Sequence, residues 1–306
     1  MLSVQLEEVI PIKFVVIANL HSGKKEGRQV LDLVAPIFDS GDVELSVMVT
    51  AFPGHAEELA GSMDFSIYDG LLVLGGDGTF HEVVNGVLKR ADGKTLPIGL
   101  LPAGSGNSIL HDLSLTDPVA AAEAIIGRRT RFIDVAQIKG DLTLRYSINL
   151  IGWGLVTDVG ERAETLRWLG PRRYTVSSVI EILRRKTRQA TLVLDEETIV
   201  DDFTFVVACN SIHIGKGMKM APSAKLDDGL IDLVVVRGSI NRQRLFSVLP
   251  KLFDGSHIEE PEVAYYQVSS FSLSSETKDN LNIDGEMVGS TPIDVEMLKQ
   301  AIEIFV

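Results

Sequence analysis

Chemistry is most readily expected in one short segment of the sequence, formed by Gly75, Gly76, Asp77, Gly78 and Thr79. Glycines allow a backbone to approach a ligand closely, and the one side chain placed between them is a carboxylate. A phosphate-binding turn that also carries a metal ligand or a proton acceptor would use these residue types. An ordinary tight turn is the alternative for so short a motif.

The segments on either side of this turn predict the elements that must position it. The apolar run 68–73 ends at the glycines and indicates a buried strand, and a helical pattern extends from Phe80 to Leu88. The first amides of such a helix and the positive end of its dipole would point at the turn. Strand, turn and helix together outline a site for nucleotide phosphates.

Two further strand-to-helix turns carry small and hydrogen-bonding side chains. Residues 19–25 follow a strand predicted at 13–18, and residues 102–108 follow a strand predicted at 98–101. The first turn lacks the spacing of a Walker loop, so a P-loop is excluded. Because the carboxyl ends of parallel strands share one edge of a sheet, the three turns are expected to converge on one ligand.

The composition indicates a soluble protein of two domains. A chain of 306 residues exceeds the usual size of a single core, and no apolar run approaches the roughly 20 residues that span a bilayer. The single cysteine, Cys209, excludes an internal disulfide, and the first residues lack the cationic start of a secretory signal; both favour a cytoplasmic location. The net charge of −13 argues against nucleic acid as a partner.

The pattern of strands and helices changes near residue 130. Before this point apolar strands alternate with helices, which predicts a parallel sheet with helices on both faces; after it, short β-rich runs predict an antiparallel sandwich. We therefore expect an α/β nucleotide-binding domain over residues 1–132 and a β-sandwich lipid-binding domain over 133–306, whose C-terminal segment could return to the first domain. Helices are expected within the second domain at 174–188 and 241–253, the first with Val176, Val179, Ile180 and Leu183 on one face.

One segment of this acidic chain is strongly basic. Such a segment is expected to face an anion, either nucleotide phosphates or an anionic membrane surface, which attracts each nearby basic residue by about 1 kcal/mol. A solvated helix face is the alternative for residues 184–188. The basic residues are Arg162, Arg167, Arg172, Arg173, Arg184, Arg185, Lys186 and Arg188.

The tryptophans and histidines favour structural interpretations. Trp153 and Trp168 are expected to pack inside the protein more often than to stack on a ligand. The histidines show no metal-ligand spacing, and all except His21 are expected to be structural or on the surface.

Taken together, these motifs resemble the diacylglycerol kinase catalytic superfamily of lipid kinases, and the middle of the chain resembles its sphingosine kinase and ceramide kinase branch. The resemblance follows the family's order and covers nearly the whole chain. The matching segments are residues 75–79 with Glu82 and Asn85, residues 102–107, residues 284–286, and, for the branch, residues 153–159 and 167–174.

The resemblance implies a kinase that uses ATP and Mg²⁺ to phosphorylate a hydroxyl of a sphingoid base, a ceramide or a related lipid, in a cleft between the domains. Asp77 would accept the proton of the lipid hydroxyl. Trp153, Asp158 and Ser108 would contact the lipid, and Asp284 and Glu286 would bind Mg²⁺. The nucleotide would be held by Asn19, Ser22, Gly23, Gly75, Gly76, Gly78, Thr79, Glu82, Gly104, Ser105, Arg167, Arg173, Asp284, Gly285 and Glu286.

The sequence departs from the sphingosine kinase pattern at Gly160. Sphingosine kinases carry an acid there that meets the amine of the substrate, whereas Asp158 is retained two positions earlier. Diacylglycerol and monoacylglycerol are therefore alternative substrates, and a soluble NAD kinase-like enzyme or a lipid-binding protein without activity are further alternatives. The expected partners are a lipid at a membrane surface, met by transient peripheral association, and a second copy in a homodimer.

Overall fold

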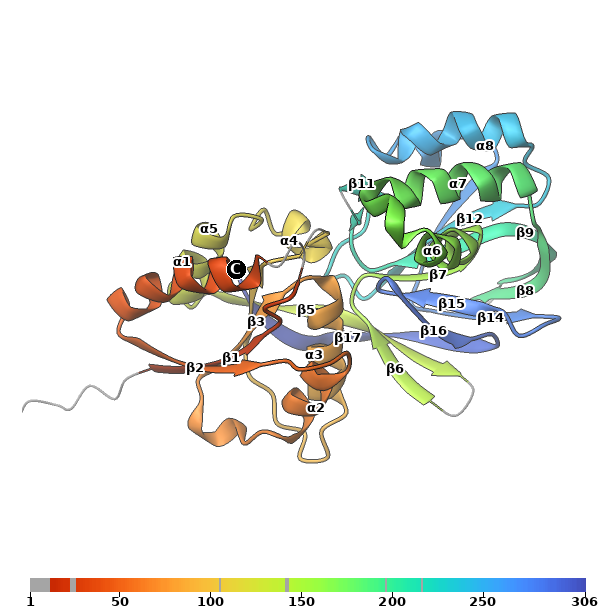
Figure 1. Ribbon diagram of the computed structural model, residues 1–306. Helices are drawn as coiled ribbons and strands as arrows, with labels where there is room; N and C mark the ends of the chain where they lie inside the picture. Colours follow the sequence, from red (N-terminus) through yellow and green to blue (C-terminus); the bar gives the residue numbers. More distant parts are fainter. Residues whose placement is uncertain (1–11, 23–25, 105, 141–142, 196, 216) are drawn as a thin grey trace, which may run out of the picture.

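Two domains lie side by side in the computed structural model (Figure 1). The structure describes residues 12–22, 26–104, 106–140, 143–195, 197–215 and 217–306. Strands alternate with helices in the first domain, and the second is built mainly of antiparallel strands, with α6, α7 and α8 along one side. The predicted fold class, a parallel-sheet α/β domain followed by an antiparallel β-sandwich, is confirmed.

The first domain is organised around parallel strands in the order β2-β1-β3-β4. Its strands are apolar at consecutive positions because both faces of the sheet are covered by helices. In β1, Val15 and Ile17 pack toward α2 and α3, whereas Phe14 and Val16 pack toward α1 and α5. The elements are β1 (Ile12–Ala18), α1 (Gly27–Ser40), β2 (Val43–Val49), α2 (His55–Ser62), η1 (Phe65–Ile67), β3 (Gly70–Gly75), α3 (Asp77–Leu88), β4 (Ile98–Pro102), α4 (Ser108–Asp112) and α5 (Pro118–Ile126).

The second domain encloses its main core between antiparallel strands, with Trp153, Phe203 and Phe271 among the buried side chains. A second apolar cluster lies between the strands and the helices α7 and α8. The elements are β5 (Thr130–Gly140), β6 (Thr143–Ser147), β7 (Leu150–Gly154), α6 (Leu155–Thr165), η2 (Arg167–Arg172), α7 (Arg173–Arg184), β8 (Arg188–Leu194), β9 (Glu197–Cys209), β10 (His213–Ile214), β11 (Met218–Lys219), β12 (Ile231–Arg237), α8 (Arg242–Val248), η3 (Leu249–Leu252), η4 (Ser256–Glu259), β13 (Val263–Val268), β14 (Ser270–Ser275), β15 (Asn280–Ile283), β16 (Glu286–Ser290) and β17 (Ile293–Phe305).

The strands β5 and β17 run through both domains as one antiparallel pair. The first half of β17 also pairs with β14 of the sandwich, and its end pairs in parallel with β4, where Ile304 lies opposite Ile98. The pairing is interrupted between Leu298 and Ile302. At this interruption Asp134 accepts hydrogen bonds from the backbone amides of Gln300, at 2.7 Å, and Gly229, at 2.6 Å. The last strand therefore completes the sheet of the first domain.

The helices of the second domain differ from the predicted ones at their ends. α7 stops at Arg184 because Arg185 adopts a left-handed conformation, with φ of 50°, and donates to the carbonyl oxygen of Gly238. The helix predicted at 241–253 gives way to the 3-10 segment η3, in which Pro250 lacks the amide that would continue the α-helix. The helix α6 was not predicted.

Candidate active site

The glycine turn after β3 meets the turn after β4 backbone against backbone. Gly75 ends β3, and a side chain there would place its first carbon 2.5 Å from Thr79 Oγ1. A side chain on Gly104 would lie well inside contact distance of the Cα atom of Gly76. Only glycine permits these approaches, so the two loops form one continuous wall of backbone.

Asp77 is the first residue of α3, and Ser108, the first residue of α4, holds its carboxylate. The backbone amide of Ser108 donates to Asp77 Oδ1 at 2.7 Å, and Ser108 Oγ lies 3.3 Å from Oδ2. Because the contact to Oδ2 is the longer of the two, Oδ2 retains capacity to accept a proton. The loop of residues 106–108 and the start of α3 therefore position this group together.

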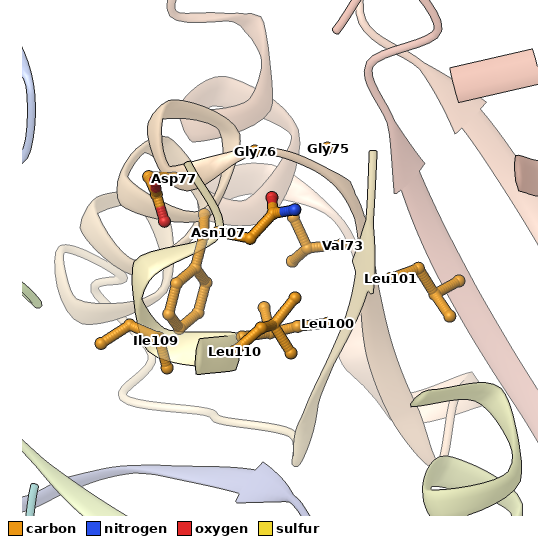
Figure 2. Close-up of a pocket in the computed structure, with 10 residues that line it drawn as sticks. Val73, Gly75, Gly76, Asp77, Leu100, Leu101, Asn107, Ile109 and Leu110 are labelled. Atoms are coloured by element: carbon orange, nitrogen blue, oxygen red, sulfur yellow. The ribbon is translucent and has the colours of Figure 1, made fainter. Parts of the chain in front are cut away.

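The environment of Asp77 favours its protonated form. Figure 2 shows Asp77 and Asn107 at the rim of a cavity of about 20 Å³, with the apolar side chains of Leu100, Ile109 and Leu110 below them. Burial raises the pKa of Asp77; the hydrogen bonds from Ser108 partly oppose this, and the charge of Asp284 adds to it. A carboxylate with a raised pKa is a stronger base than an exposed one, which suits a proton acceptor.

A cleft of about 430 Å³ opens beside the glycine turn. It is lined by the loops that follow β1, β2 and β3, and Glu286 reaches it from the second domain. At its wall Asn19 Nδ2 donates to Thr79 Oγ1 at 3.3 Å, which ties the first loop to the third. The lining residues are Asn19, His21, Ser22, Thr50, Ala51, Phe52, Pro53, Gly76, Gly78, Thr79, Glu82 and Glu286.

The cleft unites seven of the fifteen residues expected to hold the nucleotide and adds a loop that the sequence analysis overlooked. Residues 50–53, between β2 and α2, were not considered, although they form another strand-to-helix turn at the same edge of the sheet. Gly23 and Ser105 lie outside the described residues. A side chain on Gly78 would place a carbon 3.2 Å from Glu286 Oε1, so the two domains meet at the glycine turn.

Both carboxylate oxygens of Glu82 accept hydrogen bonds from backbone amides at the start of the neighbouring helix, α2. Its Oε1 accepts from the amide of Gly54 at 2.9 Å and its Oε2 from the amide of Ala56 at 3.1 Å. These amides belong to the start of α2, where a negative charge is favourable. Glu82 thereby holds the loop of residues 50–54 beside the cleft, which it also lines; its expected contact with the nucleotide stays a prediction.

Asp284 is buried and saturated with hydrogen bonds; its expected role as a metal and nucleotide ligand stays a prediction. His81 Nδ1 lies 2.7 Å from Oδ2, and Ser147 Oγ donates to Oδ1 at 2.7 Å. The backbone amides of residues 148–150 donate as well, at 2.9–3.0 Å. Five donors thus surround a side chain with no exposed surface. Gly285 continues the same turn with φ of 96°, and its amide donates to Asn282.

His81 and Asp284 form a charged pair between the domains. Burial alone would raise the pKa of Asp284, but the hydrogen bond and charge of His81, together with the surrounding donors, hold it below its usual value. Burial opposes a charge on His81 too, and Asp284 nevertheless raises its pKa. His81 thus has the structural role expected of it. It lies four residues after Asp77 on α3 and anchors this helix to the β15–β16 turn.

Of the two carboxylates expected to bind Mg²⁺, Glu286 is the one that lines the cleft. The described residues contain no group of three or more His, Cys, Asp or Glu side chains placed to hold a metal ion. Mg²⁺ commonly binds through one or two carboxylates together with substrate phosphates and water. Glu286, which lines the cleft beside the glycine turn, fits such a mode of binding.

The residues expected to contact the lipid lie in three different environments. Ser108 lies against Asp77, whereas Trp153 is 1% exposed and packs edge-on against Phe203 in the sandwich core. Asp158 is paired with Arg188 through two hydrogen bonds, of 2.6 and 3.0 Å, and lines a cavity between α6 and α7 that Asp77 does not line.

Gly160 has a packing role. A side chain there would collide with the terminal methyl group of Met287, on β16, so α6 lies directly against this hairpin. The space that a side chain at position 160 would need is taken here by Met287.

The arginines of the middle segment lie apart from the cleft. Arg167 and Arg173 both pair with Glu164, and neither lines the nucleotide cleft, so the structure does not support their expected contact with phosphates. Trp168, expected to pack, is 79% exposed. The expectation of a packed side chain is therefore wrong for Trp168 and correct for Trp153.

Comparisons with known proteins agree with the fold and with the motifs at the cleft. Residues 13–138 match the diacylglycerol kinase catalytic domain, and residues 149–306 match the YegS C-terminal NAD kinase beta sandwich-like domain. The crystal structure of a diacylglycerol kinase from Bacillus anthracis str. Sterne superimposes with a TM-score of 0.77 over 98% of each chain, at 23% identity, a similarity of fold.

Relatives of two substrate classes are similar in sequence. Sphingosine kinase 1 of Arabidopsis thaliana is 32% identical over 86% of this chain, which spans only 64% of that enzyme's length. A diacylglycerol kinase of Staphylococcus saprophyticus is also 32% identical, over 95% of this chain and 94% of its own. No described helix is long and apolar enough to cross a membrane. On these grounds the chain belongs to the diacylglycerol kinase catalytic superfamily, whose members here include both sphingosine kinases and diacylglycerol kinases.

Proposed function

We propose that the protein is a lipid kinase that transfers a phosphoryl group from ATP to a lipid hydroxyl, with Asp77 as the proton acceptor. The observation that carries the proposal is the position of Asp77: a half-buried carboxylate that adjoins the nucleotide cleft through Gly76 and has a raised pKa. As the hydroxyl attacks, Asp77 would take its proton, and Ser108 would keep the carboxylate oriented.

Phosphoryl transfer depends mainly on positioning and on neutralising charge. Backbone amides of the glycine turn, at the start of α3, would face the phosphates, and Asn19 and Thr79 would line their path. Glu286 would hold Mg²⁺, which supplies charge neutralisation at the phosphates when bound. Asp284 would contribute indirectly, because its contact with His81 fixes the first turns of α3, which carry Asp77.

A sphingoid base or a ceramide is the substrate suggested by the similarity to the plant sphingosine kinase. The pairing of Asp158 with Arg188 favours a second candidate, diacylglycerol or monoacylglycerol, because a carboxylate neutralised by an arginine offers little to a cationic amine. Position 160 provides no acid either, because it is a glycine with Met287 packed against it. A head group with neutral hydroxyls needs neither carboxylate.

The test is a transfer assay with labelled ATP on sphingosine, ceramide, diacylglycerol and monoacylglycerol in mixed micelles, with NAD as a soluble acceptor. A phosphorylated lipid that requires Mg²⁺ and disappears in Asp77→Asn is the expected result. Phosphorylated NAD, or ATP binding without any product, would overturn the proposal.

Asp158→Asn separates the two lipid classes. If Asp158 meets an amine, this variant loses activity on sphingosine and keeps activity on diacylglycerol. If Asp158 serves only Arg188, both activities change together.

A further inference from the structure

The short helix α4 is held at both of its ends. At its start, Ser108 donates to the carboxylate of Asp77 through its backbone amide and its hydroxyl group. At its end, the carboxylate of Asp112 accepts hydrogen bonds from the backbone amides of Ile212, at 2.7 Å, and His213, at 3.3 Å. The helix has only five residues, so a displacement of one end also displaces the other.

The side chain of His213 makes a further contact with the same carboxylate. Its Nδ1 lies 2.5 Å from Asp112 Oδ1, and because an ionised carboxylate only accepts hydrogen bonds, Nδ1 is the donor. The side chains of Asp112 and His213 are 6% and 17% exposed, so water competes little for this pair. Asp112 belongs to the first domain, whereas His213 begins β10 in the second. The pair therefore joins the two domains at the end of α4.

The segment that follows His213 lies close to the loop that precedes α4. A side chain on Gly106 would collide with Asp77 Oδ2, and its first carbon would lie 3.9 Å from the Cα atom of Gly215, which follows β10. Figure 1 shows α4 on the side of the first domain that faces β11, the partner strand of β10. The backbone of the second domain thus borders the surroundings of Asp77.

Buried hydrogen bonds connect this contact with the support of α3. The hydroxyl group of Ser211 donates to Asn149 Oδ1 at 2.6 Å and lies 3.2 Å from the carbonyl oxygen of His213. The backbone amide of Asn149 donates to Asp284, which contacts His81 on α3. Ser211 and Asn149 are both buried. The second domain therefore supports the proposed proton acceptor through α3, which carries it, and through α4, which orients its carboxylate.

We propose that Asp112 and His213 are positioning residues, whose contact fixes α4 against the second domain and thereby holds Ser108 where it orients the carboxylate of Asp77. The inference rests on the proposed function, in which Asp77 meets the lipid hydroxyl. A misplacement of about 1 Å at a reacting group can cost about 100-fold in rate. Neither α4 nor β10 lines the nucleotide cleft, so binding of ATP should not depend on this contact.

His213→Ala tests the contact by its effect on turnover. The kcat for lipid phosphorylation should fall about 10- to 100-fold, whereas KM for ATP should stay within about twofold of the wild-type value. His213→Asn should recover most of the loss, because the amide nitrogen of asparagine can donate to Asp112 in place of Nδ1.

His111→Ala is the matched control. His111 precedes Asp112 on α4, is exposed, and its ring lies 5.5 Å from the ring of His213, but its side chain makes no hydrogen bond with the described residues of the second domain. Its removal should leave kcat unchanged. Equal kcat in His213→Ala and His111→Ala, or a loss confined to KM for ATP, would overturn the proposal.

Asp112→Ala removes the contact from the side of the first domain. It should lower kcat at least as much as His213→Ala, because the contacts with the two backbone amides are lost as well. The double variant should have the kcat of Asp112→Ala alone, since both changes remove one shared contact. Losses that multiply would show that the two residues act separately and would contradict the proposal.

Hydrogen exchange separates the positioning from the proposed function, because it requires no activity. The Ser108 amide, which donates to Asp77, should exchange faster in His213→Ala than in the wild type or in His111→Ala, measured by mass spectrometry on peptides that cover residues 106–112. Unchanged exchange would refute the positioning, even in a protein that phosphorylates lipids. Faster exchange in a protein that phosphorylates no lipid would refute the proposed function and leave the positioning of Asp77 in place.

Discussion

Asp284→Asn is expected to destabilise the protein strongly, although the change replaces one oxygen by an amide nitrogen. Asp284 has φ of 52°, which asparagine tolerates about as well as aspartate, so the backbone is little affected. The amide oxygen can remain on the side of Ser147, where three donors meet Oδ1. The new amide group must then face His81 and the backbone amide of Ile148, which both donate to Oδ2 in the wild type.

The magnitude follows from the loss of a buried ionic partner. Removing one member of a buried pair typically costs about 3–5 kcal/mol, because the other charge is left uncompensated. For a chain of this size such a loss corresponds to a fall in Tm on the order of 10 °C. The pH dependence adds a signature: a pKa below 3.8 means that Asp284 stabilises the fold above that pH, and this contribution is lost as the pH falls further.

Thermal and denaturant unfolding at neutral pH provide the assay. Glu44→Gln is the surface control, since its pair with Lys13 is exposed and is worth at most about 1 kcal/mol. His81→Gln should be destabilising too, and the double variant with Asp284→Asn should lose less than the sum of the two changes.

The refuting result is equally specific. An Asp284→Asn protein with the Tm of the surface control and a raised Mg²⁺ requirement would identify Asp284 as a metal ligand, and the hydrogen bonds that surround it would then have no structural importance.

Three further changes test the active site. Asp77→Asn should abolish turnover yet leave Tm unchanged or higher at neutral pH, because a raised pKa means that the charged form of Asp77 costs stability once the pH exceeds its ordinary value of 3.8; a large fall in Tm would contradict this. Ser108→Ala removes one hydrogen bond that lowers the pKa of Asp77, so the acid limb of the kcat profile should move to higher pH, and an unchanged or lowered limb would count against the contact. Gly104→Ala should crowd Gly76 and lower the free energy of unfolding by about 1–3 kcal/mol. It should also lower the affinity for ATP, measured by calorimetry. Its control, Gly61→Ala, adds a carbon whose nearest neighbour lies at 3.5 Å, and equal ATP affinity in both variants would refute the crowding argument.

The architecture was accessible from the sequence because it depends on local patterns. Apolar runs that end in glycine turns predicted β3 and β4, and the change to short β-rich segments predicted the sandwich. The helix α6 was not predicted because Gly160 interrupts its pattern. Gly160 is needed for the contact with Met287, which lies far away in the sequence and leaves no local signal.

The different environments of Asp284 and Glu286 within the site could not be predicted in the same way. Asp284 and Glu286 flank one glycine, and the sequence does not distinguish them. The fold does: one carboxylate is enclosed by donors, and the other lines the cleft. The periodicity of α7 likewise identified its apolar face but not its direction: Val176, Val179 and Leu183 are exposed, whereas Glu181, which pairs with Arg162, is buried.

The strand β17 imposes an order on folding. Ile304 pairs with Ile98, and Ile302 and Phe305 lie in the two cores of the first domain. During synthesis from the N-terminus, β4 must keep an unpaired edge until β17 has emerged after the entire sandwich. Unpaired edges invite association with other chains, and contacts so distant in sequence form slowly. The first domain, although synthesised first, is therefore completed only after the second.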